Sequence, residues 1–69
     1  MKFRERLTEE LKYSKLTQKQ IAEKLNISEG NITNWKKGEN LPSLDVFYAL
    51  CVLLEVSSDY LLGITDDYK

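Results

Sequence analysis

The chain contains no histidine and a single cysteine among its 69 residues. One cysteine cannot form an intramolecular disulfide, and the usual zinc-ligand spacings cannot occur. No apolar run approaches the roughly 20 residues that a membrane-spanning helix needs. The N-terminal segment MKFRERLTEE lacks the apolar stretch of a signal peptide. These absences predict a cytoplasmic protein with no metal, no cofactor and no membrane partner.

The sequence also lacks the residue combinations on which common enzymes depend. It has no nucleophile–base arrangement, no phosphate-binding loop and no cluster of metal ligands. We therefore do not expect an enzyme. Cys51 lies among apolar residues with no evident basic neighbour, which favours a small buried hydrophobe over a redox switch.

The net charge of −1 hides an asymmetry between the two halves of the chain. Residues 1–37 carry nine Lys or Arg and five Asp or Glu, whereas residues 38–69 carry one Lys and six acids. A basic half can face a polyanion while the acidic half faces away from it. Ordinary solubilising charge gives a similar pattern, so both interpretations stay open.

Two helices are predicted in the first part of the chain. Phe3, Leu7 and Leu11 are four residues apart and form one helical stripe. This helix is expected to end near Ser14. The next begins after Thr17, because this residue is a good N-cap and the glutamine three residues later completes a capping-box pattern.

Three further helices are predicted downstream. The third follows Ser28 and ends at KKGEN, where the lysines suit the negative end of the helix dipole and Gly38 suits a left-handed position. The fourth follows Pro42. Its apolar residues recur at three- and four-residue steps, at Leu44, Phe47, Leu50, Cys51 and Leu54. The fifth covers residues 59–62 and is closed by Gly63.

No stretch is typical of a strand, so the prediction is an all-α bundle. We expect one domain over residues 1–65, followed by a short acidic tail at residues 66–69. A domain this small removes only about 60% of its unfolded surface from water. Several of its helices are too short to persist alone, so tertiary packing must hold them.

The break between the second and third helices, in the stretch IAEKLNIS, is the most informative local feature. Asn26 can adopt the positive φ of a sharp turn, and Ile27 then enters the core as an apolar plug. The small Ala22 lets two helices cross closely. The shared inner face comprises Ile21, Ala22, Leu25, Ile27, Ile32 and Trp35. This pattern is typical of a helix-turn-helix, although an αα-corner in another helical domain has the same spacing.

The segment LTQKQIAEKLNISEGNITNWKKGENLPSL resembles the helix-turn-helix of the Cro and phage-repressor family, the xenobiotic-response-element-like regulators. The matching positions are Leu16, Thr17, Gln18, Ile21, Ala22, Leu25, Ile27, Ser28, Ile32, Trp35, Gly38 and Pro42. A second segment, LEVSSDYLLG, resembles the end of that family's domain. Asn26 departs from the glycine usual in the family, a small expected cost without change of fold. The resemblance implies a compact five-helix, lambda-repressor-like DNA-binding domain.

This resemblance implies a sequence-specific regulator of transcription, of the repressor type, that binds double-stranded DNA. The recognition helix would cover about residues 28–37 and enter the major groove. An alternative stays open, namely a helix-turn-helix interaction module, an antitoxin or adaptor, that acts mainly through a protein partner. The acidic second half of the chain favours this alternative.

The residues expected to read bases follow from the helical spacing of the third helix. At about 100° per residue, Ile32 and Trp35 share one side of the helix. The opposite side holds Gly30, Thr33, Asn34 and Lys37, and Glu29 and Asn31 lie on the flanks. The candidates for base reading are Glu29, Gly30, Asn31, Thr33 and Asn34. An asparagine amide can pair with N6 and N7 of adenine, and a threonine can contact a thymine methyl. Glu29 can accept from cytosine N4, or it can simply favour the helix dipole.

The residues expected to contact phosphates lie at two helix ends. At the start of the second helix, backbone N–H groups and the helix dipole favour an anion, and the family resemblance implies that Gln18 holds a phosphate. The full set is Thr17, Gln18, Lys19, Lys36, Lys37 and Asn40. Each of these can instead be a solvated surface residue.

The family resemblance also implies a homodimer on a near-palindromic operator, with half-sites about one helical turn apart. The expected dimer surface is the fifth helix and its flanks, at Val56, Tyr60, Leu61 and Ile64. The alternative is that these residues complete the core, which is favoured for Leu61.

Overall fold

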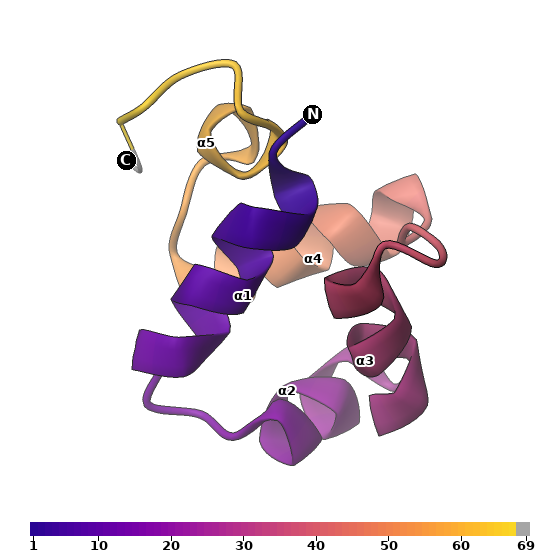
Figure 1. Ribbon diagram of the computed structural model, residues 1–69. Coiled ribbons are helices and arrows are strands. Elements are labelled where there is room, and N and C mark those ends of the chain that lie inside the picture. Colours follow the sequence, from indigo (N-terminus) through magenta and orange to yellow (C-terminus); the bar gives the residue numbers. More distant parts are fainter. Residues whose placement is uncertain (68–69) are drawn as a thin grey trace.

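The computed structural model describes residues 1–67, which form five α-helices and no strand (Figure 1). Their bounds are α1 (Phe3–Tyr13), α2 (Gln18–Leu25), α3 (Glu29–Lys37), α4 (Leu44–Leu54) and α5 (Ser58–Leu62). The predicted all-α architecture is confirmed, and each helix lies within a few residues of its predicted place. No helix among residues 1–67 combines the length and apolar character needed to cross a membrane.

All five helices contribute to one apolar core. Its buried members are Phe3, Leu7, Ile21, Ala22, Ile32, Trp35, Leu50, Cys51, Val56 and Leu61. Phe3 and Phe47 meet edge to face, with ring centroids 5.8 Å apart, and so join α1 to α4. One predicted core position is wrong: Leu44 leaves 82% of its surface exposed, because it lies on the outward face of α4 together with the exposed Tyr48 and Val52.

The helix ends follow local side-chain chemistry. Thr17 Oγ1 accepts from the backbone N–H of Gln20 over 3.1 Å, and Gln20 Oε1 accepts from the backbone N–H of Thr17 over 2.9 Å. The predicted capping box is therefore confirmed. Gly38, with φ of 78°, ends α3 as predicted. Glu55 ends α4 with φ of 57°, a left-handed conformation that was not predicted for this residue.

The turn between α2 and α3 has the predicted backbone. Asn26 adopts φ of 57° and the Ile27 amide donates to the Ala22 carbonyl over 3.0 Å. Ile27 packs against the core but stays partly exposed. The expectation that it is fully enclosed is therefore corrected: it covers the edge of the core where the two helices diverge.

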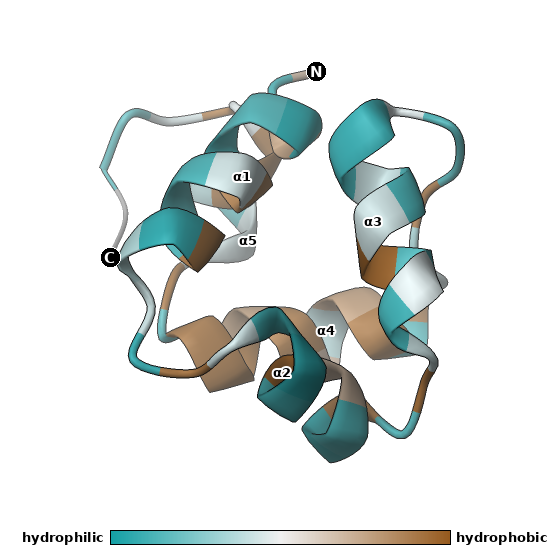
Figure 2. Ribbon diagram, turned by 60° about the horizontal axis from the view of Figure 1, so that its bottom comes forward, coloured by the Kyte–Doolittle hydropathy of each residue, from teal (hydrophilic) through white to brown (hydrophobic). Residues whose placement is uncertain are grey.

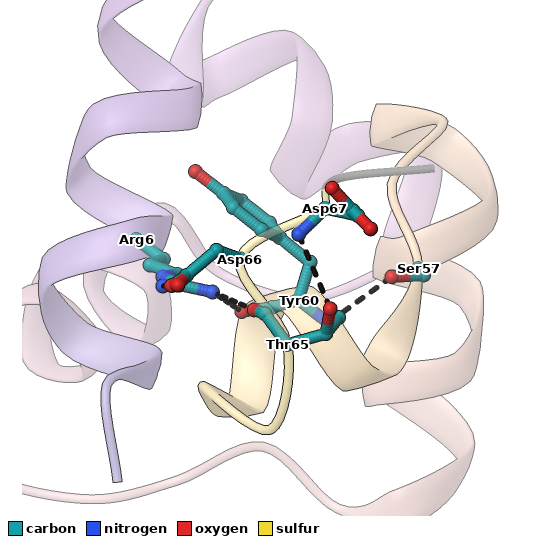
Figure 3. A network of polar contacts seen from close by, with 6 residues as sticks. All are labelled: Arg6, Ser57, Tyr60, Thr65, Asp66 and Asp67. Atoms are coloured by element: carbon teal, nitrogen blue, oxygen red, sulfur yellow. Dashed lines mark hydrogen bonds and ion pairs between the residues drawn. The ribbon is translucent and has the colours of Figure 1, made fainter.

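The segment after α5 is held against α1 by Arg6 (Figure 3). Its guanidinium donates to the Tyr60 carbonyl over 2.7 Å, to the Thr65 carbonyl and to the Asp66 carboxylate. It also lies 4.2 Å from the centroid of the Tyr60 ring. Contacts to α1 thus continue past the boundary predicted after residue 65. Residues 68 and 69 of the predicted tail lie outside the described residues.

Candidate nucleic-acid interface

The outer side of α3 is the surface on which the predicted base-reading residues gather. Ile32 and Trp35 are buried against the core, and α3 packs on α1 and α2 through that side. Glu29 and Gly30 are exposed, whereas Thr33 and Asn34 are half-buried. Thr33 and Asn34 are therefore more covered than predicted, and Gln18 of α2 lies against Thr33.

A side-chain contact fixes α2 relative to this surface. Gln18 Nε2 donates to Thr33 Oγ1 over 2.8 Å and, more weakly, to the Glu29 carbonyl over 3.4 Å. Both amide hydrogens of Gln18 are thus used inside the protein. A phosphate contact by this side chain would require one of these bonds to open, whereas the contact as it stands positions Thr33.

The two asparagines of α3 have different surroundings. Asn31 Nδ2 donates to Ser28 Oγ over 3.1 Å, so its amide is partly engaged at the helix start. Within residues 1–67 the Asn34 side chain makes no hydrogen bond, which leaves a complete amide for an external partner. A Cβ on Gly30 would meet only Ser28 Oγ, at 3.9 Å. The protomer itself therefore does not need a glycine there, and a ligand can approach the backbone closely.

The start of α2 offers backbone donors. The first N–H groups of a helix have no partner inside the helix, and the dipole adds partial positive charge. Gln18 and Lys19 supply such N–H groups, and the Lys19 side chain is exposed. Thr17 is exposed as well, but its hydroxyl accepts from Gln20. It can still donate its own hydrogen to an anion.

The end of α3 gathers positive charge, and it includes a residue that the sequence analysis missed. Lys37 and Asn40 are exposed and Lys36 is half-buried. The Arg4 side chain, from α1, lies beside Gly38: a Cβ on that glycine would stand 3.1 Å from Arg4 Nη1. Arg4 had no sequence signal, because the packing of α1 on α3 joins positions more than 30 residues apart.

Two residues of the predicted dimer surface are not available for it. Val56 and Leu61 are both buried in the protomer core. The interface prediction is therefore wrong for Val56, and for Leu61 the favoured alternative, that it completes the core, is confirmed. Their side chains complete the packing of α4 on α5. Ile64 is exposed, and Tyr60 is half-buried beneath Arg6. The sequence pattern could not separate inward from outward residues in a helix this short.

Cys51 is buried, as predicted, and burial raises the pKa of its thiol. A thiol in this setting stays protonated near neutral pH, so it behaves as a small apolar side chain.

The geometry can be compared with known proteins. Residues 8–61 match the family model HTH_3, described as helix-turn-helix. The chain is 40% identical over 63 residues to the uncharacterized HTH-type transcriptional regulator YobD of Bacillus subtilis, covering 91% of this chain and 56% of that protein. It is 41% identical over 63 residues to the HTH-type transcriptional regulator ImmR of the same organism, covering 91% and 50%.

A phage protein is a third relative. The chain is 35% identical over 63 residues to the cryptic phage CTXphi transcriptional repressor RstR of Vibrio cholerae, covering 91% of this chain and 56% of that protein. The chain thus spans about half the length of the curated relatives that it matches.

A solved structure has the same fold. The solution structure of the SOS-response transcriptional repressor LexA from Eubacterium rectale matches with a TM-score of 0.80 and 27% identity, over 87% of this chain and 64% of that chain. Together with the matching family model and the relatives of 35% to 41% identity, this establishes the family. The chain belongs to the helix-turn-helix family of the Cro and phage-repressor type.

Proposed function

We propose that this protein is a cytoplasmic regulator of transcription, of the repressor type, that binds double-stranded DNA through α3. The observation that carries the proposal is the outer side of α3, where the Asn34 amide has no partner within residues 1–67 and Lys37 is exposed one turn away. Gln18 braces the same surface through Thr33. A polar helix face of this kind has the dimensions and hydrogen-bonding groups that the major groove accepts.

In this proposal Asn34 and Asn31 read base edges, and adenine is the base that an asparagine amide pairs with through two hydrogen bonds. Glu29, Gly30 and Thr33 complete the reading surface. Phosphates bind at the start of α2 and around the end of α3, where Lys36, Lys37, Asn40 and Arg4 lie together with the α3 terminus. Such contacts position the protein on the duplex but carry no sequence information.

One protomer contacts few base pairs, so the proposal includes a homodimer on a near-palindromic operator. Two α3 helices would then enter successive major grooves about one helical turn apart. The relatives YobD, ImmR and RstR are named as transcriptional regulators or a repressor, which supports regulation as the role of this chain.

Selection from a random duplex library tests this proposal. We expect an enriched motif with two symmetric halves at a fixed spacing. With that motif, Asn34→Ala should weaken binding by about 1–3 kcal/mol and relax the preference at one base pair of each half. Lys37→Ala should weaken binding to all sequences and reduce the slope of log affinity against log salt by about 1.

Lys12→Ala is the matched control, because Lys12 is an exposed lysine on α1. It should leave both the motif and the salt slope unchanged. Circular dichroism checks that each variant folds. Unchanged operator affinity in both α3 variants would show that the reading surface lies elsewhere. No enriched motif, together with recovery of a stable protein partner, would favour the antitoxin or adaptor alternative instead.

A further inference from the structure

The outward side of α4 carries an exposed apolar ridge. Leu44, Tyr48 and Val52 are spaced four residues apart and leave 82%, 71% and 61% of their surfaces exposed. Residues at this spacing lie on one helix face. The ridge is hereafter the α4 ridge. Figure 2 shows brown along most of α4, whereas α1 and α2 carry more teal.

A groove borders the α4 ridge on each side. One groove, of about 570 Å³, lies towards α5 and is lined by Cys51, Val56 and Leu62 besides the ridge itself. The other, of about 260 Å³, lies towards α2 and is lined by Leu25, Ala49 and Leu53, with Lys24 at its edge. Both linings are mainly apolar. Apolar surface therefore extends on both sides of Leu44, Tyr48 and Val52.

We propose that the α4 ridge docks against the α4 ridge of a second copy of this chain, with the two helices antiparallel across a two-fold axis near Tyr48. The ridge suits this arrangement because Leu44 and Val52 stand four residues on either side of Tyr48. Each Leu44 then meets the partner copy's Val52, and the two Tyr48 side chains meet near the axis. A two-fold interface requires self-complementarity of this kind.

The charges at the edge of the ridge favour the same arrangement. Lys24 borders the α2-side groove, whose α4 residues are Tyr48, Ala49, Val52 and Leu53, the C-terminal part of the ridge. Asp45 follows Leu44, so at helical spacing it lies on that same side of the ridge, near its N-terminal end. The two-fold axis places this side of one ridge against the same side of the other ridge, while the two helices run in opposite directions. It therefore brings Lys24 of each copy towards Asp45 of the other.

This inference gives the proposed dimer a surface on α4 instead of α5. It leaves the outer side of α3 uncovered, because no α3 residue belongs to the ridge or lines either groove. It rests on the proposed function in one respect: the dimer is proposed to serve DNA binding. Self-association is measured without DNA, so its failure and the failure of DNA binding are separate results.

Sedimentation equilibrium of the full chain over a range of concentrations tests the dimer. We expect a monomer–dimer equilibrium in which Tyr48→Lys, which places two like charges at the axis, raises the dissociation constant at least tenfold. Tyr13→Lys is the matched control, since Tyr13 is 73% exposed on α1. It should leave the equilibrium unchanged. Because Tyr48 is mostly exposed, Tyr48→Lys should keep its helical circular dichroism signal.

Two further sets of variants test the register. Lys24→Glu should weaken the dimer, and adding Asp45→Lys should restore it. In a Cys51→Ala background, Tyr48→Cys should form a disulfide-linked dimer under mild oxidation, whereas Tyr13→Cys should not. A chain that stays monomeric at all concentrations overturns the proposal. So does a dimer that Ile64→Lys dissociates while Tyr48→Lys leaves it intact, because the interface then lies beyond α5.

Discussion

Helices α3 and α4 are alike on the inside and different on the outside. Each begins after a serine with extended backbone and ends at a left-handed residue, and each buries two residues in the common core. The outer side of α3 presents amides, a hydroxyl and lysines, whereas the outer side of α4 presents Leu44, Tyr48 and Val52.

This difference indicates that the buried residues determine the fold of both helices, whereas the outer residues determine what each helix can bind. A polar side with an unused amide suits the base edges of a duplex. An apolar side of similar length gains little from a polyanion and gains more from burial against another apolar surface. Two neighbouring helices of one small domain can therefore serve two kinds of partner.

The largest predicted effects test whether the buried sides of α3 and α4 contribute equally to stability. Ile32→Ala in α3 and Leu50→Ala in α4 each remove a fully buried aliphatic side chain. Each should lower the free energy of unfolding by about 2–5 kcal/mol, measured by urea denaturation. Val52→Ala, at the exposed side of α4, should change it by less than about 0.5 kcal/mol when the titration is run at a concentration at which the chain is monomeric. A large loss in only one of the two core variants would show that the helices are not held alike.

The sequence predicted the inner sides of these helices well, because periodic apolar residues and caps are local signals. Ile32 and Trp35 are buried as the spacing indicated, and Thr17 forms its capping box. Leu44 fits the same three- and four-residue pattern and yet lies outside the core. A three- and four-residue repeat covers a wide arc of the helix, and it does not show which residues at the edge of that arc face solvent.

The candidate site could be predicted only in part. The residues of α3 were found because they share one short segment with a recognised motif. Arg4 and the Gln18–Thr33 bond were not found, because each joins segments that only the tertiary fold brings together. The left-handed backbone at Glu55 was missed for another reason: glutamate is not a residue type that favours this conformation.

The next effect concerns the helix ends. Gly38 closes α3 with φ of 78°, and a Cβ there would also stand 3.1 Å from Arg4 Cδ. Gly38→Ala should therefore lower the free energy of unfolding by about 1–2 kcal/mol, since a side chain in the left-handed region is strained. Gly30→Ala is the matched control, because that glycine has no positive φ and open space around its Cβ position. It should be neutral or slightly stabilising in the same urea titration.

The smallest effect has the opposite sign and concerns the end of α4. Glu55 holds the left-handed position that glycine holds in α3, with φ of 57°. Glu55→Gly relieves the steric strain, but glycine loses more conformational freedom on folding. The net result should be a gain of about 0.5–1 kcal/mol in the free energy of unfolding, seen as a higher urea midpoint with an unchanged m-value.

Asn26→Gly tests whether the strain at a left-handed position depends on the residue type or on the backbone conformation alone. Asn26 has the same φ of 57°, but asparagine tolerates the left-handed region better than glutamate does. Its replacement by glycine should therefore gain less than Glu55→Gly. Equal gains at the two positions would mean that φ alone sets the strain, and a loss at position 55 would mean that the glutamate side chain stabilises the end of α4 through contacts that outweigh it.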